Sequence, residues 1–157
     1  MFVGVANKDG NCIYRSSDAG QSFTALPTNC AGFYPVQAEI SENGYLYLCY
    51  ADSCGPNAAT TNGAVYRYDL SAGKFEEITP ACNDNRYGGF SGISVDGSDP
   101  NVIVCGTLGF WDSKGENLYR STDGGETWTP FFTTTEKNYV MDVSGAEWLT
   151  WGREEAQ

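Results

Sequence analysis

The sequence has 157 residues, the length of one ordinary domain, and its composition, 41% hydrophobic and 14% aromatic, predicts a folded chain rather than a disordered one. The net charge of −11 argues against a nucleic acid or an anionic membrane as a partner. The absence of histidine excludes Ser-His-Asp and Cys-His catalysis by this chain alone, and also the usual zinc ligand sets, so we expect no metal and no cofactor.

In chain order the sequence predicts only strands and turns. Apolar and polar residues alternate in the strands, and Gly, Asn, Asp and Pro mark the turns. Asn43-Gly44 is a strong hairpin signal between two of the strands. The expected strands are residues 1–6, 12–17, 23–26, 36–41, 45–51, 64–69, 74–79, 91–95 and 102–107, followed by a hairpin over 117–132.

The hairpin over residues 117–132 carries the motif on which the interpretation of the chain depends. Its turn runs from Ser121 to Trp128, and within it Asp123 is suited to accept hydrogen bonds from backbone N–H groups while Gly125 is suited to a positive φ. The pattern Ser-x-Asp-x-Gly-x-Thr-Trp resembles the Asp-box, or BNR repeat. That repeat is the signature of sialidases, sortilin-type receptors and several glycoside hydrolase propellers.

A second copy of this pattern lies near the N-terminus. Its four positions are Ser16, Asp18, Gly20 and Phe23. A third, degenerate copy over residues 65–75 has Leu70 where the aspartate should be. Tyrosines in the three lead-in strands stand at positions 14, 66 and 119, which are 52 and 53 residues apart, and a period of this size predicts a repeat architecture.

Each repeat holds four short antiparallel strands, as the blade of a β-propeller does. The predicted fold class is therefore all-β, a β-propeller fragment of four-stranded antiparallel blades with Asp-box repeats. We predict an incomplete blade over 1–35, blades over 36–89 and 90–138, and the start of another over 139–157. Propellers close with at least four blades, so we interpret the chain as a piece of a larger propeller. Closure of a ring by several copies is the alternative.

The alignment of the repeats also gives an expected strand register. Placing the second strands of the blades together aligns residues 3–5, 48–50 and 104–106. Cys49 and Cys105 then occupy equivalent positions, and we interpret both as small buried residues.

The turn between the third and fourth strands of a propeller blade lies on the face opposite the loops that are available to a ligand. Because the Asp-boxes lie in those turns, we expect Asp18 and Asp123 to lock turns rather than to act as catalytic acids. The loops on the other face carry aromatic rings that can stack on sugars and polar groups that can bind hydroxyls. The candidate substrate-binding residues there are Trp111, Phe110, Tyr87, Asp112 and Tyr34.

The cysteines form no close Cys-x-x-Cys pair, so disulfides are favoured over a metal cluster. Cys12 and Cys30 occupy two loops on one face of a blade, and Cys54 and Cys82 occupy the equivalent loops of the next. This placement predicts the pairings Cys12–Cys30 and Cys54–Cys82. A Cys30–Cys54 bond across the blade boundary is left open as a competitor.

Short motifs along nearly the whole chain occur in an order that resembles glycoside hydrolase family 74, the xyloglucanases and related endo-β-1,4-glucanases. The matching segments correspond to the later blades of the first propeller of that family. They are residues 44–48, 63–68, 78–80, 87–96, 99–101, 111–112, 121–128 and 148–149.

The resemblance implies a two-propeller enzyme that hydrolyses β-1,4-glucans, especially xyloglucan, with inversion in an open cleft. Inversion needs two carboxyl groups about 6.5–9.5 Å apart. In the family these come from parts of the two propellers that this chain does not match, so no catalytic residue is carried over. Phe110-Trp111 matches a position where two tryptophans commonly line the cleft, and Phe110 departs from that pattern. Residues 35–37 depart from the Pro-His-Lys often found there.

The residues by themselves also allow other functions. One is a non-catalytic Asp-box propeller module, sortilin-like or carbohydrate-binding. A sialidase is disfavoured because a cluster of arginines for a carboxylate is missing, with Arg86 alone on the ligand side. A stand-alone enzyme that uses Asp52, Asp84 or Asp112 is disfavoured because the ring is incomplete.

We expect the protein to act outside the cell, since disulfides and a plant polysaccharide both point there. No signal peptide is visible in this segment, and no apolar run approaches the roughly 20 residues of a membrane span. The expected partners are a polysaccharide, xyloglucan or a related β-glucan, together with the remaining blades and the second propeller of a larger protein.

Overall fold

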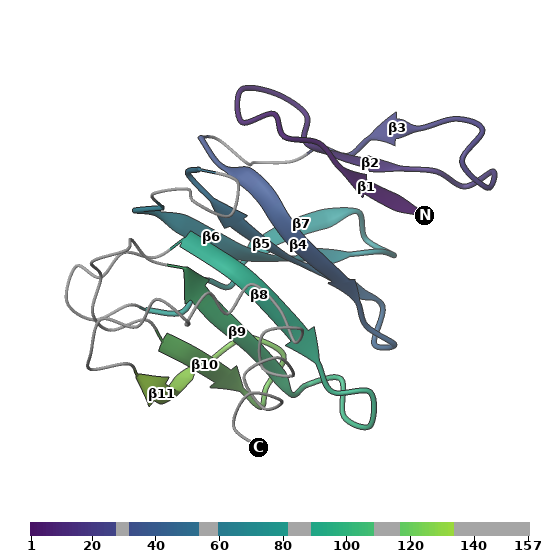
Figure 1. Ribbon diagram of the computed structural model, residues 1–157. Coiled ribbons are helices and arrows are strands. Elements are labelled where there is room, and N and C mark those ends of the chain that lie inside the picture. Colours follow the sequence, from purple (N-terminus) through teal and green to yellow (C-terminus); the bar gives the residue numbers. More distant parts are fainter. Residues whose placement is uncertain (28–31, 54–59, 82–88, 109–116, 134–157) are drawn as a thin grey trace, which may run out of the picture.

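The computed structural model describes residues 1–27, 32–53, 60–81, 89–108 and 117–133, which form three antiparallel sheets (Figure 1). The first sheet contains β1 (Phe2–Gly4), β2 (Ile13–Arg15) and β3 (Thr24–Ala25). The second contains β4 (Tyr34–Ile40), β5 (Tyr45–Ala51), β6 (Gly63–Asp69) and β7 (Lys74–Glu77). The third contains β8 (Gly89–Val95), β9 (Ile103–Leu108), β10 (Asn117–Ser121) and β11 (Thr129–Thr133).

Each sheet is a meander in which every strand lies beside the next one in the chain. The three sheets stack in the order in which they occur, with the second between the other two (Figure 1). The predicted all-β class with four-stranded antiparallel sheets is confirmed. The described residues contain no helix, and therefore none long and apolar enough to cross a membrane.

Strand β5 is the centre of the molecule, because every residue of it after Tyr45 is buried. Tyr47 belongs to the apolar cluster between the second and third sheets, whereas Leu48 belongs to the cluster between the first and second sheets. Since both faces of β5 are covered, its sequence Tyr-Leu-Tyr-Leu-Cys-Tyr-Ala is apolar almost throughout instead of alternating.

The predicted hairpin at Asn43-Gly44 joins β4 to β5. Gly44 has a φ of +87°, a conformation that glycine adopts without a steric penalty. Its N–H donates to the carbonyl of Ser41 at 3.1 Å. The turn therefore forms as its sequence predicts.

The register of the strands corrects one prediction. Tyr66 of β6 pairs with Leu48, whereas Tyr119 of β10 pairs with Cys105. Cys105 is thus equivalent to Leu48, and Cys49 lies one position further along. Because a shift of one residue turns a side chain to the other face of a sheet, the two cysteines are not equivalent. Each faces the other's sheet, in one shared cluster, and both are buried as predicted.

The thiol of Cys49 makes a hydrogen bond of 3.4 Å to the carbonyl of Gly92, in the neighbouring sheet. Burial raises the pKa of this thiol. A neutral, enclosed thiol of this kind is chemically inert, so Cys49 has a packing role.

Candidate functional site

Of the five candidate substrate-binding residues, one lies in the part of the chain that the structure describes. Tyr34 is described, whereas Tyr87, Phe110, Trp111 and Asp112 lie outside the described residues. Tyr34 begins β4 and pairs with Ala51, the last residue of β5. It therefore stands at the edge of the second sheet opposite the hairpin turn at Gly44.

The ring of Tyr34 is half-buried, and the ammonium group of Lys8 lies 5.8 Å from the ring centroid. This is the geometry of a cation–π contact, worth about 0.5–1 kcal/mol at an exposed site. A sugar that stacks on this face of Tyr34 has to displace the Lys8 side chain, at a cost of that order.

Asp52 lies at the same edge, and its carboxylate is occupied by its own loop. The Thr61 backbone N–H donates to it at 2.9 and 3.2 Å, and the Thr61 hydroxyl donates as well. The Asp52 N–H in turn donates to the carbonyl of Asn62 at 2.9 Å. A carboxylate that already closes a loop is a poor candidate for a catalytic acid, which further disfavours a stand-alone enzyme built on Asp52.

Thr60 attaches this loop to the third sheet. Its side chain is buried, and a Cβ placed on Gly89, the first residue of β8, would lie 2.6 Å from the Thr60 Cβ. Gly89 is therefore required for close packing rather than for a special φ. This contact between the loop after β5 and the start of β8 holds two ligand-side elements of neighbouring sheets together.

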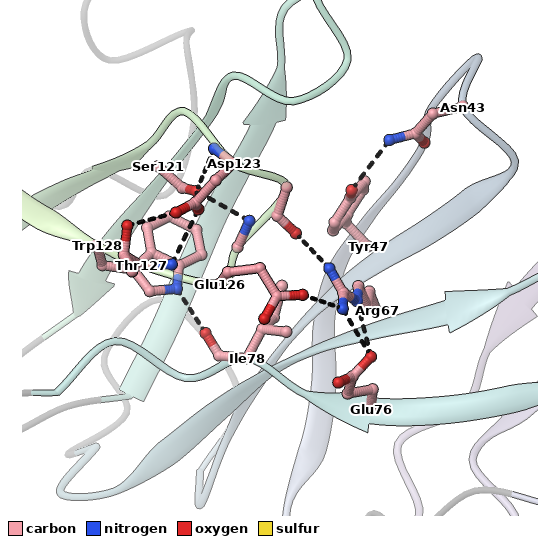
Figure 2. A network of polar contacts seen from close by, with 12 residues as sticks. Asn43, Tyr47, Arg67, Glu76, Ile78, Ser121, Asp123, Glu126, Thr127 and Trp128 are labelled. Carbon is pink, nitrogen blue, oxygen red and sulfur yellow. Dashed lines mark hydrogen bonds and ion pairs between the residues drawn. The ribbon is translucent and has the colours of Figure 1, made fainter.

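The predicted Asp-box at the opposite edge forms a closed set of hydrogen bonds (Figure 2). The Ser121 hydroxyl donates to Asp123 at 2.7 Å and accepts from the Gly125 N–H at 2.8 Å. The Asp123 carboxylate also accepts from the Thr127 N–H at 2.9 Å and from the Thr127 hydroxyl. Gly125 has a φ of +95°. These bonds tie the two ends of the turn between β10 and β11 together.

The turn between β2 and β3 repeats the same bonds. The Ser16 hydroxyl donates to Asp18 at 2.8 Å and accepts from the Gly20 N–H at 2.8 Å. The carboxylate of Asp18 accepts from the N–H of Ser22 at 2.9 Å and from its hydroxyl at 2.6 Å. The two turns, 105 residues apart in the sequence, therefore have the same internal structure.

Hydrogen bonds lower the pKa of both aspartates in the folded state. Hydrogen bonds from the Ser22 hydroxyl and N–H lower the pKa of Asp18 to about 2, and those from Thr127 lower the pKa of Asp123 to about 2. A group with so low a pKa is a poor proton donor near neutral pH. The low pKa of both carboxylates suits side chains that hold a turn together better than side chains that donate a proton in catalysis. That the two aspartates lock turns stays our prediction.

The third-sheet turn also contacts the second sheet. The indole N–H of Trp128 donates to the carbonyl of Ile78 at 2.6 Å (Figure 2). A Cβ on Gly125 would lie 2.6 Å from the Ile78 Cδ1, so this turn packs directly on Ile78. The sequence pattern predicted the turn, but nothing in it predicted Ile78 as the partner.

Arg67 makes a second bridge between these sheets (Figure 2). Its guanidinium donates to the carbonyl of Gly124 at 2.9 Å and pairs with Glu76 and Glu126. It also lies 5.3 Å from the ring centroid of Tyr45. Because both glutamates are largely exposed, the partly buried bond to Gly124 is the part of this bridge that stabilises most.

The degenerate middle turn has a lock that sequence analysis missed. Asp69 accepts from the N–H groups of Ser71 and Ala72, each at 2.8 Å, and from the Ser71 hydroxyl at 2.6 Å. Leu70, which replaces the expected aspartate, packs into the apolar cluster between the first two sheets. The missed signal was an aspartate two residues before a serine, the sequence of an Asx turn.

The predicted disulfides cannot be scored from the described residues. Cys12 is buried beneath the first sheet, but Cys30, Cys54 and Cys82 lie outside the described residues. Both pairings therefore stay predictions. In the part of the chain that the structure describes, no three His, Cys, Asp or Glu side chains come together as a possible metal site.

No protein-family model matches the chain. Among curated proteins, it is 36% identical to the xyloglucanase Xgh74A of Acetivibrio thermocellus over 98% of its own length and 19% of that protein. It is 33% identical to a xyloglucanase of Hypocrea jecorina over 95% of its length and 18% of that protein. The chain thus spans about a fifth of the length of these relatives.

Solved structures give the same match. The structure superposes on the GH74 enzyme of Niastella koreensis with a TM-score of 0.72 and 33% identity, covering 82% of this chain and 19% of that one. It superposes on the GH74 xyloglucanase of Xanthomonas campestris with a TM-score of 0.73 and 29% identity, covering 83% of this chain and 18% of that one. Sequence and fold therefore agree on one family.

Proposed function

We propose that this chain, which matches a segment of glycoside hydrolase family 74 enzymes in sequence and fold, supplies part of the substrate cleft of a xyloglucan or β-1,4-glucan hydrolase. The observation that carries this proposal is the match of nearly the whole chain to proteins named xyloglucanases. The chain provides cleft loops and not the catalytic carboxylate pair. Alone, it binds glucan without cleaving it.

The two edges of the sheets differ in a way that supports this role. At one edge, the carboxylates of Asp18 and Asp123 are committed to hydrogen bonds within turns. At the other edge, Tyr34 begins a strand, Asp52 accepts from the Thr61 N–H, and Thr60 packs against Gly89 of the next sheet. A rigid edge that positions loops is what a carbohydrate cleft requires.

Within this proposal, sugar rings stack on Trp111 and Phe110, with Tyr87 and Tyr34 beside them, and Asp112 binds hydroxyl groups. Aromatic faces and acidic side chains are the groups that recognise neutral sugars.

The rest of the protein completes the site. We infer further blades, in addition to those over residues 36–89 and 90–138, and a second propeller that holds the other side of the cleft. The protein is secreted, and the pairings Cys12–Cys30 and Cys54–Cys82 stabilise its ligand-side loops in an oxidising environment. Hydrolysis of the glucan with inversion belongs to this larger protein.

The test is a calorimetric titration of the chain with xyloglucan oligosaccharides. Trp111→Ala removes the central stacking ring, and loss of one aromatic stacking platform costs about 1–3 kcal/mol, so we expect affinity to fall by about fivefold or more. Phe23→Ala is the matched control, because it removes an exposed aromatic ring at the opposite edge. Its affinity should equal that of the wild type.

Two results would contradict the proposal. One is a folded, monodisperse chain that binds no xyloglucan oligosaccharide. The other is an equal loss of affinity in Trp111→Ala and Phe23→Ala, since that would place the sugar away from the ligand-side edge.

A further inference from the structure

The dipeptide Asn-Gly occurs twice in the sequence, as Asn43-Gly44 in the turn between β4 and β5 and as Asn62-Gly63 at the start of β6. In such a pair the glycine nitrogen can attack the side-chain amide of the asparagine, because glycine has no Cβ to obstruct the approach. The attack expels ammonia and leaves a cyclic imide, which water opens to aspartate or isoaspartate. Both asparagines are exposed, so water reaches each of them. Their hydrogen bonds, however, are different.

At the first pair, both reacting groups are engaged with other partners. The Asn43 amide donates to the Tyr47 hydroxyl at 3.3 Å (Figure 2) and to the Pro100 carbonyl, in the neighbouring sheet, at 3.2 Å. The Gly44 N–H donates to the carbonyl of Ser41 at 3.1 Å. An attack on the Asn43 side chain therefore requires that these bonds break first.

At the second pair, the two reacting groups contact each other. The Gly63 N–H donates to Oδ1 of Asn62 at 2.9 Å, so the nitrogen lies against the carbonyl group whose carbon it attacks. Gly63 faces Ala51 across the sheet, and beside this pair the Asp52 N–H donates to the Asn62 carbonyl at 2.9 Å. This is the pattern of a non-hydrogen-bonded pair of antiparallel strands. The Gly63 N–H thus points out of the β5–β6 ladder.

The backbone on both sides of Asn62 is fixed. Before it, the N–H of Thr61 donates to the Asp52 carboxylate at 2.9 and 3.2 Å, and the Thr61 hydroxyl donates as well. After it, Gly63 begins β6. A nucleophile that is held beside the group it attacks reacts faster than one that has to find it.

We propose that Asn62 is a modification site, at which the chain deamidates itself through the nitrogen of Gly63. A bond forms between that nitrogen and Cγ of Asn62, and the bond from Cγ to Nδ2 breaks. The Gly63 N–H proton passes to hydroxide, and the departing nitrogen leaves as ammonia after taking a proton from water. Water then opens the imide, giving aspartate when it breaks the new bond and isoaspartate when it breaks the original peptide bond.

Either product changes the loop that follows β5. Aspartate adds a negative charge close to the carboxylate of Asp52. Isoaspartate passes the main chain through the former side chain of Asn62, which displaces the carbonyl that accepts from the Asp52 N–H. We therefore expect the Asp52 amide proton to exchange with solvent faster in the modified chain than in the fresh one.

The test is peptide mapping by mass spectrometry of the folded chain after incubation at mildly alkaline pH, with an isoaspartyl methyltransferase to label isoaspartate. We expect Asn62 to convert, and Asn43 to convert roughly tenfold more slowly because its two side-chain bonds have to break first. The same chain in urea is the reference. Without the fold, the two Asn-Gly pairs should convert at similar rates.

Two matched variants assign the signal to its residue. Glutamine in place of asparagine keeps an amide but forms the cyclic imide slowly. Asn62→Gln should therefore remove most of the isoaspartate label and keep the Asp52 amide exchange at its initial rate during incubation. Asn43→Gln should leave the label at the wild-type level. Circular dichroism checks that each variant is folded.

Two results would overturn the proposal. One is an Asn62 that stays unmodified in the folded chain while it converts in urea. The other is an Asn43 that converts in the folded chain as fast as Asn62 does. Both readouts are independent of sugar binding.

Discussion

The two predicted Asp-box turns have the same internal hydrogen bonds and different surroundings. In the third sheet, Trp128 closes the turn over Ile78 of the second sheet and donates to its carbonyl. In the first sheet, the equivalent Phe23 is 43% exposed and has no indole N–H to donate. The comparison separates two properties of such a turn. Its own geometry is local, and its contribution to holding sheets together depends on a neighbouring sheet.

The separation follows from the distances along the chain. The bonds among Ser121, Asp123, Gly125 and Thr127 span at most four residues, so they form wherever the short motif occurs. The bond from Trp128 to Ile78 spans 50 residues and requires two sheets to stack. The first kind of bond can be predicted from eight residues of sequence, and the second cannot.

The largest difference is expected when the closing aromatics are removed. Trp128→Ala deletes packing between two sheets and leaves the Ile78 carbonyl without its donor, so it should lower the free energy of unfolding by about 3 kcal/mol. Phe23→Ala should lower it by less than about 1 kcal/mol, because that ring is already exposed. Urea denaturation at low protein concentration measures both. Equal losses would show that the two turns are not distinguished by their neighbours.

The glycines of the two turns give the next effect. Gly20→Ala and Gly125→Ala both place a side chain at positive φ, which costs roughly 1–2 kcal/mol. At Gly125 the added Cβ also meets Ile78 at 2.6 Å, whereas at Gly20 the nearest atom is the Met1 sulfur at 3.7 Å. We expect the Gly125 variant to lose about 1 kcal/mol or more beyond the loss at Gly20. Thermal unfolding measures both variants, and equal midpoint temperatures for Gly20→Ala and Gly125→Ala would contradict this expectation.

The arginines after the lead-in tyrosines extend the comparison to polar bridges. Arg67 donates from a largely buried position to the Gly124 carbonyl, so Arg67→Met should lower stability by about 1.5 kcal/mol. Arg15 is the equivalent residue of the first sheet and is exposed, so Arg15→Met should change stability by less than about 0.5 kcal/mol. The measurement is urea denaturation in parallel, and a larger loss at Arg15 would reverse the comparison.

The smallest effect is the one that both turns should share. The folded pKa of Asp18 and of Asp123 is about 2, below the unfolded value of about 3.9. A lowered pKa contributes stability above the unfolded value, and this contribution is lost as the pH falls from about 4 to about 2. Asp18→Asn and Asp123→Asn should each flatten the decline over that range, to a similar extent. The measurement is the free energy of unfolding as a function of pH. If only one of the two variants flattened the decline, the hydrogen bonds within the turns would not be its cause.

Sequence analysis predicted those features that depend on few neighbouring residues. The strands, the Asn43-Gly44 hairpin and the four-stranded antiparallel sheets follow from alternation and turn residues, and they are confirmed. The resemblance to glycoside hydrolase family 74 is also confirmed, because an ordered series of short motifs over a whole chain is hard to obtain by chance.

Sequence analysis failed for features that depend on a one-residue difference in register or on a partner far away in the sequence. The alignment of Cys49 with Cys105 was wrong by one residue. The pairs Leu48–Tyr66 and Cys105–Tyr119 are separated by different lengths of chain, so the sequence spacing did not give the register. Asp69 gave no Asp-box signal because it stands one position before the aspartate of that pattern. Gly124 gave no signal, since it acts through its backbone carbonyl. Ile78 gave none because its contacts with Gly125 and Trp128 arise only when the two sheets stack.

The most direct test of the account is hydrogen–deuterium exchange of the chain with and without a saturating xyloglucan oligosaccharide. In the proposed function, the ligand binds at one edge of the sheets and the turn locks lie at the other. This arrangement predicts ligand-dependent protection in residues 108–116 and in the loop from Asp52 to Gly63, with no change in residues 16–23 and 121–128. Protection confined to those two turns would contradict it, because the Asp-box edge would then be the binding surface.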